Sequence, residues 1–288
     1  MHIHNWEIAM PSLPLPIAAL AAASHIAPAL VAPVFRRMML RPRRHVRPPP
    51  DLELPAADER LDLGDGLVAW RWGQGPAVLL VHGFEGSRMQ FAAMVEALVD
   101  RGLSAVALDV PAHGESTGDE LTVVQFVAAI ERTLSKLGGV QAVVGHSMGG
   151  AVSLYAVTQS GGARRAALIA APSSIKRELQ RFASAVGLSA RGRTAFIRSV
   201  ETYVGRPATD FDVRNIVGKA DLPLLLIHDR NDRRVPVVEA ARAAHVLPHA
   251  ELVVTHGLGH NRLLADPSVI AAVVDFVAQD TAGSASIV

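Results

Sequence analysis

The sequence predicts an α/β fold with a mostly parallel eight-stranded sheet, helices on both faces of the sheet and a small helical cap. From residue 58 onward, short β-branched or aliphatic runs alternate with longer helical patterns. This alternation is typical of parallel sheets whose two faces are covered by helices. The chain has 288 residues, half of them hydrophobic, and is therefore long enough to bury one large core.

The expected strands are apolar runs bounded by turn residues. The first two, at residues 59–63 and 67–72, are joined by the hairpin signal Gly64-Asp65-Gly66. Further strands are expected at residues 77–81, 104–109, 140–144, 165–170, 223–228 and 250–255. Helical periodicity predicts helices near residues 87–100, 122–137, 151–159, 237–247 and 267–279.

The chain is expected to divide into an N-terminal appendage at residues 1–57 and a main domain at residues 58–288. Within the main domain, residues 172–220 separate the sixth expected strand from the seventh. This segment contains several arginines and aromatic residues, which predicts short amphipathic helices that form a cap over the cleft. Its arginines indicate a solvated outer face, with a receptor for an acidic substrate group as the alternative.

The N-terminal appendage contains a long stretch without charge. Residues 8–35 contain no formally charged side chain, and six arginines follow between Arg36 and Arg47. The stretch is long enough to span a bilayer, but its five prolines and its polar Ser24-His25 pair oppose a spanning helix. Three alternatives remain for it: a packed or peripheral helix, a disordered segment, or a membrane anchor. Membrane contact, if it occurs, is expected through residues 8–47.

The position of the arginines bears on the compartment. A secretory signal carries its positive charge before the apolar region, whereas here the arginines follow it. We therefore expect a cytoplasmic protein, either dissolved or associated with the inner face of the membrane. The proline-rich residues 47–55 are expected to form a linker.

Composition and charge exclude several kinds of function. The formal net charge of +1 gives the chain no overall electrostatic reason to bind nucleic acid. The lack of cysteine excludes a disulfide framework, a thiolate metal site and a cysteine nucleophile. Histidines near strand ends show no paired metal-ligand spacing, so neither a metal nor a cofactor is expected. We expect these imidazoles to hydrogen-bond loop backbone; they are His82, His113, His146 and His228.

The residues that directly follow the strands carry the candidate chemistry, because ligands of open α/β sheets bind beyond the carboxyl ends of the strands. The most informative is Gly145-His146-Ser147-Met148-Gly149, which follows an apolar run and precedes a helical run. Glycines two positions before and after a serine permit a sharp strand-to-helix turn that exposes the hydroxyl. Ser147 is therefore a candidate nucleophile.

Five motifs, in this order along the chain, resemble those of the α/β-hydrolase family. They are His82-Gly83, the Asp-x-Pro-x-His-Gly-x-Ser pattern at residues 109–116, the serine turn, Asp232 with Val235-Pro236, and Gly257-Leu258-Gly259-His260. The resemblance covers residues 58–279 and points to esterase-like and lysophospholipase-like serine hydrolases. It implies a Ser-Asp-His order of functional residues along the chain.

The resemblance implies roles for individual residues. A serine hydroxyl needs a neighbouring base, and that base needs a carboxylate to fix its tautomer. Ser147 is accordingly expected to be the nucleophile, His260 the general base and then acid, and Asp232 the orienting acid. The backbone N–H groups of Phe84 and Met148 are the expected oxyanion donors.

Two rivals compete for these roles. His256 lies four positions before His260, but it ends a strand, whereas Gly257 and Gly259 form a loop that can present His260. Asp229 competes with Asp232, yet only Asp232 is followed by Val-Pro at the spacing of the family. We therefore favour His260 and Asp232.

These residues predict a serine hydrolase that cleaves carboxylic esters through an acyl-enzyme intermediate. The aromatic residues of the cap segment favour small to medium apolar acyl groups. A serine at the sharp turn opposes epoxide hydrolase and dehalogenase chemistry, for which the family uses aspartate there. Alternatives are a membrane-associated lysophospholipase, or a thioesterase or carbon–carbon bond hydrolase with the same three residues. A catalytically idle binding module is disfavoured, because no member of the trio is missing. The oligomeric state is not predicted.

Overall fold

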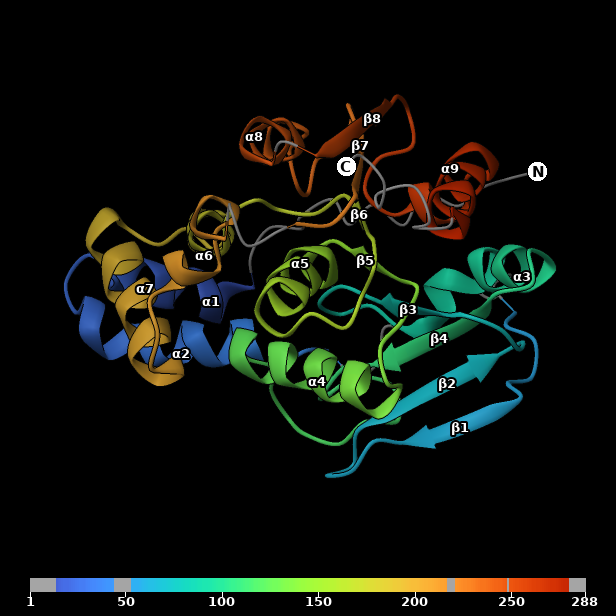
Figure 1. The fold of residues 1–288 in the computed structure, drawn as a ribbon. Helices are drawn as coiled ribbons and strands as arrows, with labels where there is room; N and C mark the ends of the chain where they lie inside the picture. Colours follow the sequence, from blue (N-terminus) through green and yellow to red (C-terminus); the bar gives the residue numbers. More distant parts are fainter. Residues whose placement is uncertain (1–13, 44–52, 217–220, 248, 280–288) are drawn as a thin grey trace. The chain divides into compact units, whose positions relative to one another are not determined.

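The computed structural model describes residues 14–43, 53–216, 221–247 and 249–279 (Figure 1). These residues form two compact units. The first, here called the sheet unit, comprises the described residues of the ranges 40–175 and 208–288. The second, here called the helical unit, comprises the described residues of the ranges 1–39 and 176–207.

The sheet unit is built on an eight-stranded sheet, as the sequence predicts. The strand order is β1-β2-β4-β3-β5-β6-β7-β8. The strands are β1 (Glu59–Asp62), β2 (Val68–Trp72), β3 (Ala77–Val81), β4 (Ser104–Asp109), β5 (Ala142–His146), β6 (Ala166–Ile169), β7 (Leu224–Asp229) and β8 (Ala250–Thr255). β2 pairs antiparallel with β1 and β4, and the other pairs are parallel. The carboxyl ends of β3 to β8 therefore lie along one edge of the sheet.

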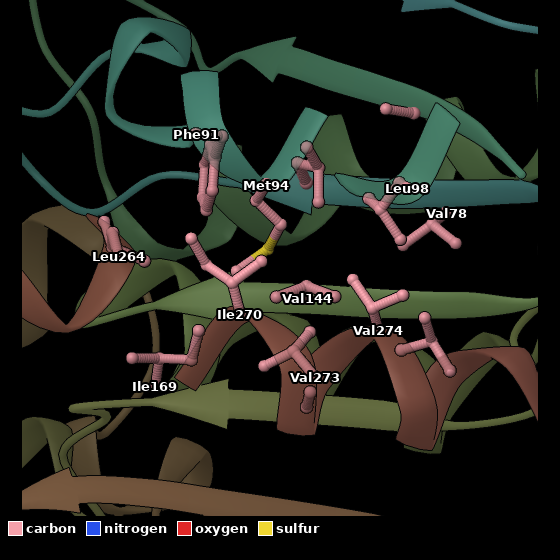
Figure 2. Close-up of a cluster of buried hydrophobic side chains, with 14 of the residues drawn as sticks. Val78, Phe91, Met94, Leu98, Val144, Ile169, Leu264, Ile270, Val273 and Val274 are labelled. Atoms are coloured by element: carbon pink, nitrogen blue, oxygen red, sulfur yellow. The ribbon is translucent and has the colours of Figure 1, made fainter. Parts of the chain in front are cut away.

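Helices cover both faces of this sheet. α3 (Ala92–Asp100) and α9 (Pro267–Ala278) pack on one face, and α4 (Val123–Lys136), α5 (Met148–Ser160) and α8 (Val238–Val246) lie on the other side. Because side chains alternate along a strand, each strand supplies both layers. Val144 and Ile169 pack with Met94 and Val273 on the first face (Figure 2). Full burial of such a side chain contributes about 1.5–3 kcal/mol.

Several element boundaries differ from the sequence prediction, most of them by one residue, and two of the larger differences concern β5 and α5. The strand expected at residues 140–144 begins at Ala142, because Val140 follows two glycines and forms only an isolated bridge with Ala163. α5 begins at Met148, directly after Ser147, and not at residue 151. The first turn of α5 contains Gly149 and Gly150, whose low helix propensity concealed the true start of the helix.

The helical unit contains α1 (Leu15–Ala23), α2 (Pro28–Leu40), α6 (Ile175–Ala185) and α7 (Ala190–Val204), apart from Leu40 and Ile175. The turn between α1 and α2 contacts the start of α7: the Ser189 N–H donates to Ser24 Oγ at 2.9 Å, and the Ser189 hydroxyl donates to the Ser24 carbonyl at 2.9 Å. The N-terminal helices and the helices of the expected cap thus form one packed body.

The structure bears on the alternatives for the N-terminal stretch only in part. Residues 15–23 and 28–40 are helical and packed. Residues 8–13, Arg44 and Arg47, most of the expected linker and the end of the expected cap at 217–220 lie outside the described residues. In the described ranges, no helix combines the length and the apolar character that crossing a bilayer requires.

Candidate active site

Ser147 lies in the sharp turn between β5 and α5. Its φ angle of 54° is one that L side chains rarely adopt. The neighbouring glycines are sterically required: a Cβ at Gly145 would lie 2.5 Å from the Gly150 Cα, and a Cβ at Gly149 would lie 2.4 Å from the His82 carbonyl oxygen. The turn places Ser147 at the carboxyl end of β5 and at the N-terminus of α5.

The hydroxyl of Ser147 is within hydrogen-bond distance of His260, whose ring also reaches Asp232. Ser147 Oγ lies 3.0 Å from His260 Nε2, and His260 Nδ1 lies 2.7 Å from Asp232 Oδ2. The three residues follow β5, β8 and β7, and all belong to the sheet unit. In this geometry an imidazole can take the proton of a serine while a carboxylate fixes the imidazole tautomer.

Hydrogen bonds keep the carboxylate of Asp232 ionised. Burial would raise the pKa of Asp232, but hydrogen bonds from His228 and His260 lower it well below its usual value. Asp232 Oδ1 also accepts the N–H groups of Arg234 and Val235 at 2.8 and 2.9 Å. An anion held in this way can stabilise positive charge on His260.

His260 is buried and is supported from a second side by His146. The two rings lie 4.8 Å apart, and His146 Nε2 donates to the His260 carbonyl at 2.9 Å. Burial lowers the pKa of His260 below its usual value, although the Asp232 carboxylate opposes this shift. The imidazole of His260 is therefore uncharged near neutral pH and can accept a proton from Ser147.

The two rival residues occupy other positions. Asp229 holds the loop that carries His260: its oxygens accept hydrogen bonds from the N–H groups of Asn231, Leu258 and Gly259 and from the hydroxyl of Thr255. These bonds lower the pKa of Asp229 although burial opposes them. His256 is exposed. The structure therefore brings His260 and Asp232 together with Ser147. It brings neither His256 nor Asp229 into contact with this serine.

The expected oxyanion donors belong to two turns that meet at Ser147. Gly83 lies directly against the serine, since a Cβ at Gly83 would be 2.9 Å from Ser147 Cβ. Phe84 is the next residue in that turn. Met148 is the first residue of α5, so its N–H lacks an acceptor within the helix and is suited to an oxyanion.

The other four histidines near the strand ends each donate to a backbone carbonyl, as the sequence predicts. The acceptors of His82, His113, His146 and His228 are the carbonyls of Gly83, Pro111, His260 and Val235, at 2.8–2.9 Å. Burial lowers the pKa of His82 to about 3 and that of His146 well below its usual value. The uncharged imidazoles of His82 and His146, and the rings of His113 and His228, thus brace loops of the site.

The turn after β4 is braced by Asp109 and Ser116. Asp109 Oδ2 accepts from Trp70 Nε1 at 3.2 Å, from the Glu115 N–H at 3.1 Å and from Arg88. Burial raises the pKa of Asp109 in spite of Arg88. The Ser116 hydroxyl donates to the Asp109 carbonyl. This turn carries His113, whose Nε2 accepts the Glu85 N–H at 2.9 Å.

Sequence reasoning missed an ion pair beside the turn that contains Phe84. Glu85, directly after Phe84, accepts from Arg43 Nε and Nη2 at 2.8 Å each and from the Arg43 N–H at 3.2 Å. Burial would raise the pKa of Glu85, but the bonds from Arg43 lower it. The two residues are 42 positions apart, and no local pattern marks the pair.

No group of three or more histidine, cysteine, aspartate or glutamate side chains in the described ranges is placed to hold a metal ion. The polar groups around Ser147 are instead committed to one another and to loop backbone. The chemistry that this arrangement supports is proton transfer and nucleophilic attack by a serine.

Two family models match the chain. A model described as alpha/beta hydrolase fold matches residues 76–186, and a model described as TAP-like protein matches residues 198–284. Together with the strand order and the serine turn, these matches show that the chain belongs to the α/β-hydrolase fold family.

Individual relatives are esterases and lipases by name. The chain is 29% identical over 241 residues to the pimeloyl-acyl-carrier protein methyl ester esterase of Xanthomonas campestris pv. campestris strain B100, covering 69% of this chain and 93% of that protein. Among solved structures, an esterase of Pyrococcus furiosus has a TM-score of 0.60 at 24% identity, covering 83% of this chain and 98% of that chain. A monoacylglycerol lipase of Paleococcus ferrophilus has a TM-score of 0.57 at 17% identity, covering 74% and 98%. The structural likenesses concern the fold.

Proposed function

We propose that this protein is a serine hydrolase that cleaves carboxylic esters of small to medium apolar acyl groups through an acyl-enzyme intermediate. The observation that carries the proposal is the continuous contact from Ser147 Oγ to His260 Nε2, at 3.0 Å, and from His260 Nδ1 to Asp232 Oδ2, at 2.7 Å. The name of the Xanthomonas relative, a methyl ester esterase, supports ester cleavage.

The proposed reaction begins with proton transfer. His260 Nε2 takes the proton of the Ser147 hydroxyl as the oxygen attacks the ester carbonyl. The carbonyl oxygen becomes negatively charged and accepts hydrogen bonds from the N–H groups of Phe84 and Met148. Asp232, held ionised by its own donors, stabilises the imidazolium that forms.

The second half of the reaction releases both products. The imidazolium of His260 gives its proton to the leaving alkoxide as the carbon–oxygen bond breaks, which leaves the acyl group on Ser147. His260 then takes a proton from water as the water attacks the acyl-enzyme. The carboxylic acid departs, and the proton returns to Ser147.

The test of this proposal uses a panel of p-nitrophenyl esters of increasing acyl length on the full chain and on Ser147→Ala. We expect the highest turnover with short and medium chains, and a loss of at least about 10³-fold in kcat for Ser147→Ala. Residual activity of Ser147→Ala near that of the unaltered protein would contradict the proposal.

Covalent labelling with a fluorophosphonate provides an independent readout. The label is expected on Ser147, because His260 activates only this hydroxyl in the described site. Mass mapping of the adduct to another residue would overturn the assignment of the nucleophile. If the ester panel instead shows a preference for acyl chains longer than medium length, the substrate class shifts toward lysophospholipids.

A second candidate is a hydrolase that works at a lipid surface. The specific observation in its favour is the apolar character of α1 and α2. Leu15 in α1, Leu30 in α2 and Ile26 in the turn between them are largely exposed. We further propose a cytoplasmic location with peripheral membrane contact through the part of residues 8–47 that these helices contain. Cell fractionation that places the full chain outside the cytoplasm and inner membrane would contradict this location.

A further inference from the structure

The outward face of α1 carries no polar side chain, and that of α2 carries exposed apolar residues beside a single exposed arginine, Arg37. The exposed fractions are 86% for Leu15, 91% for Ile26, 79% for Leu30 and 41% for Val34. Ile26 lies in the turn between the helices, four positions before Leu30, which itself lies four positions before Val34. Within α2, residues with this spacing share one face of the helix, so Leu30 and Val34 do.

The buried face of α2 is also apolar. Val31, Ala32 and Phe35 are almost entirely buried within the fold. A helix that packs on a core with one face normally presents charged or polar residues on the other. α2 presents Leu30, Val34 and Arg37 there. An exposed apolar face of this kind marks a surface that meets another apolar phase.

Positive charge lies close to this apolar face along the chain, although Arg43 is paired with Glu85. Residues 8–50 contain six arginines and no aspartate or glutamate. Arg37 and Arg41 are exposed at the end of α2 and just beyond it. Arg36 lies over the ring of Tyr203, 4.1 Å from its centroid, and Tyr203 is 47% exposed. An apolar face with arginines and a tyrosine at its border suits the boundary between acyl chains and headgroups.

We propose that the exposed face of α1 and α2 docks this protein onto a bilayer surface that contains anionic lipid. Leu15, Ile26, Leu30 and Val34 enter the acyl boundary, and Arg37 remains at the level of the phosphate groups. The inference deepens the lipid-surface candidate above, but it does not depend on ester cleavage, because binding is measured without turnover.

A lipid surface fits the charge pattern better than a second copy of the chain. A two-fold contact between copies pairs the same surface with itself, so the arginines that border one face would approach those of the other. Like charges brought together in this way disfavour the contact. An anionic headgroup layer compensates the same arginines.

The first experiment measures flotation of the full chain with phosphatidylcholine vesicles that contain or lack phosphatidylglycerol. We expect binding to the anionic vesicles, and at least about tenfold weaker binding for the double variant Ile26→Glu with Leu30→Glu, which adds two negative charges to the apolar face. The matched control is Val124→Glu with Val254→Glu, because these valines are also exposed but lie in the sheet unit. The control is expected to bind as the unaltered chain does.

A second variant isolates the electrostatic part. Arg37→Gln is expected to weaken binding to anionic vesicles by about fivefold, and raised salt is expected to reproduce the loss. Ester turnover in buffer without vesicles is expected to stay unchanged in all these variants, which separates a failure of this inference from a failure of the proposed activity.

Three outcomes would overturn the inference. The unaltered chain does not float with anionic vesicles, the control variant loses binding as strongly as the Ile26 and Leu30 variant, or light scattering shows a dimer that this variant makes monomeric. The last outcome would assign the face to a second copy of the chain.

Discussion

The turn after β4 contains one buried aspartate and one buried histidine, and so do the loops after β7 and β8 taken together. In these two regions the pKa of the aspartate is shifted in opposite directions. The side chains of Asp109 and Asp232 are both inaccessible to solvent. Burial raises the pKa of Asp109, whereas hydrogen bonds from His228 and His260 lower that of Asp232 in spite of burial. Burial alone therefore does not decide the charge of an aspartate.

The difference comes from the distribution of donors. Both oxygens of Asp232 are engaged, Oδ1 by two backbone N–H groups and Oδ2 by His260. Oδ1 of Asp109 has no hydrogen-bond partner among the described residues, and the donors gather on Oδ2. The donors therefore outweigh burial at Asp232, and at Asp109 they do not.

The largest expected effect follows from replacing the engaged carboxylate. In Asp232→Asn, the oxygen can still accept the N–H groups of Arg234 and Val235, but the amide N–H group faces His260 and favours the tautomer protonated at Nε2. This tautomer cannot accept the proton of Ser147. We expect kcat for p-nitrophenyl butyrate to fall by about 10³–10⁴-fold without loss of fold.

The matched control for this variant is Asp109→Asn, which changes the other buried carboxylate in the same way. Circular dichroism checks that both variants are folded. If both lose turnover equally, the distinction between the two regions is wrong.

The next effect concerns acid. Because burial lowers the pKa of His260 below 6.5, its imidazole remains an effective base to a lower pH than an exposed histidine does. We expect kcat/KM to be flat near neutral pH and to fall about tenfold per pH unit below an apparent pKa under 6.5. Asp109→Asn is expected to leave this limb in place, and a limb above pH 7 would contradict the assignment.

Acid is also expected to lower the stability of the fold. His82 has a pKa of about 3 in the folded chain, against 6.5 when exposed, so the unfolded chain binds more protons between these values. Stability therefore rises with pH across this window and is lost as the pH falls through it. Thermal unfolding measured from pH 4 to pH 7 checks the direction, and an unfolding temperature that rises on acidification would contradict it.

A smaller effect is expected for Asp109→Asn itself. The asparagine oxygen can still accept from Trp70 and Glu115, and Arg88 retains a contact with Glu115 at 3.7 Å. We expect the free energy of unfolding to fall by about 1–3 kcal/mol. Chemical denaturation measures this change, and kcat is expected to stay within about threefold of the unaltered value.

The smallest expected effect is that of Arg43→Ala. The side chain of Arg43 is 66% exposed, and exposed ion pairs contribute little, about 0.2–1 kcal/mol. Because Glu85 follows Phe84 directly, its loss of support is expected to lower kcat by about two- to fivefold with little change in KM. The control is Arg41→Ala, which removes an exposed arginine nearby. Equal effects of the two variants would show that the ion pair of Arg43 and Glu85 does not position the turn that contains Phe84.

The sequence predicts the sheet and the placement of Ser147, Asp232 and His260 because steric demands leave local marks. Gly145 and Gly149 must be glycine for β5 and α5 to approach. Contacts between segments that lie far apart in the sequence produce no such local pattern. Ser24 and Ser189, 165 positions apart, are ordinary serines until the fold joins them, and Arg43 and Glu85 are likewise ordinary charges. The sequence likewise leaves Asp229 as a rival of Asp232, because the role of Asp229 depends on four donors that only the folded loop brings together.

The buried imidazoles around Ser147 have a consequence for chemical modification. Five histidines at the site are buried, namely His82, His113, His146, His228 and His260. The other four histidines of the described ranges are exposed, namely His25, His245, His249 and His256. An imidazole-acylating reagent such as diethyl pyrocarbonate reaches the exposed rings first. The first carbethoxy groups that the reagent adds are therefore expected to leave the activity unchanged. Loss of activity is expected to lag behind the number of carbethoxy groups per chain, as measured by mass spectrometry.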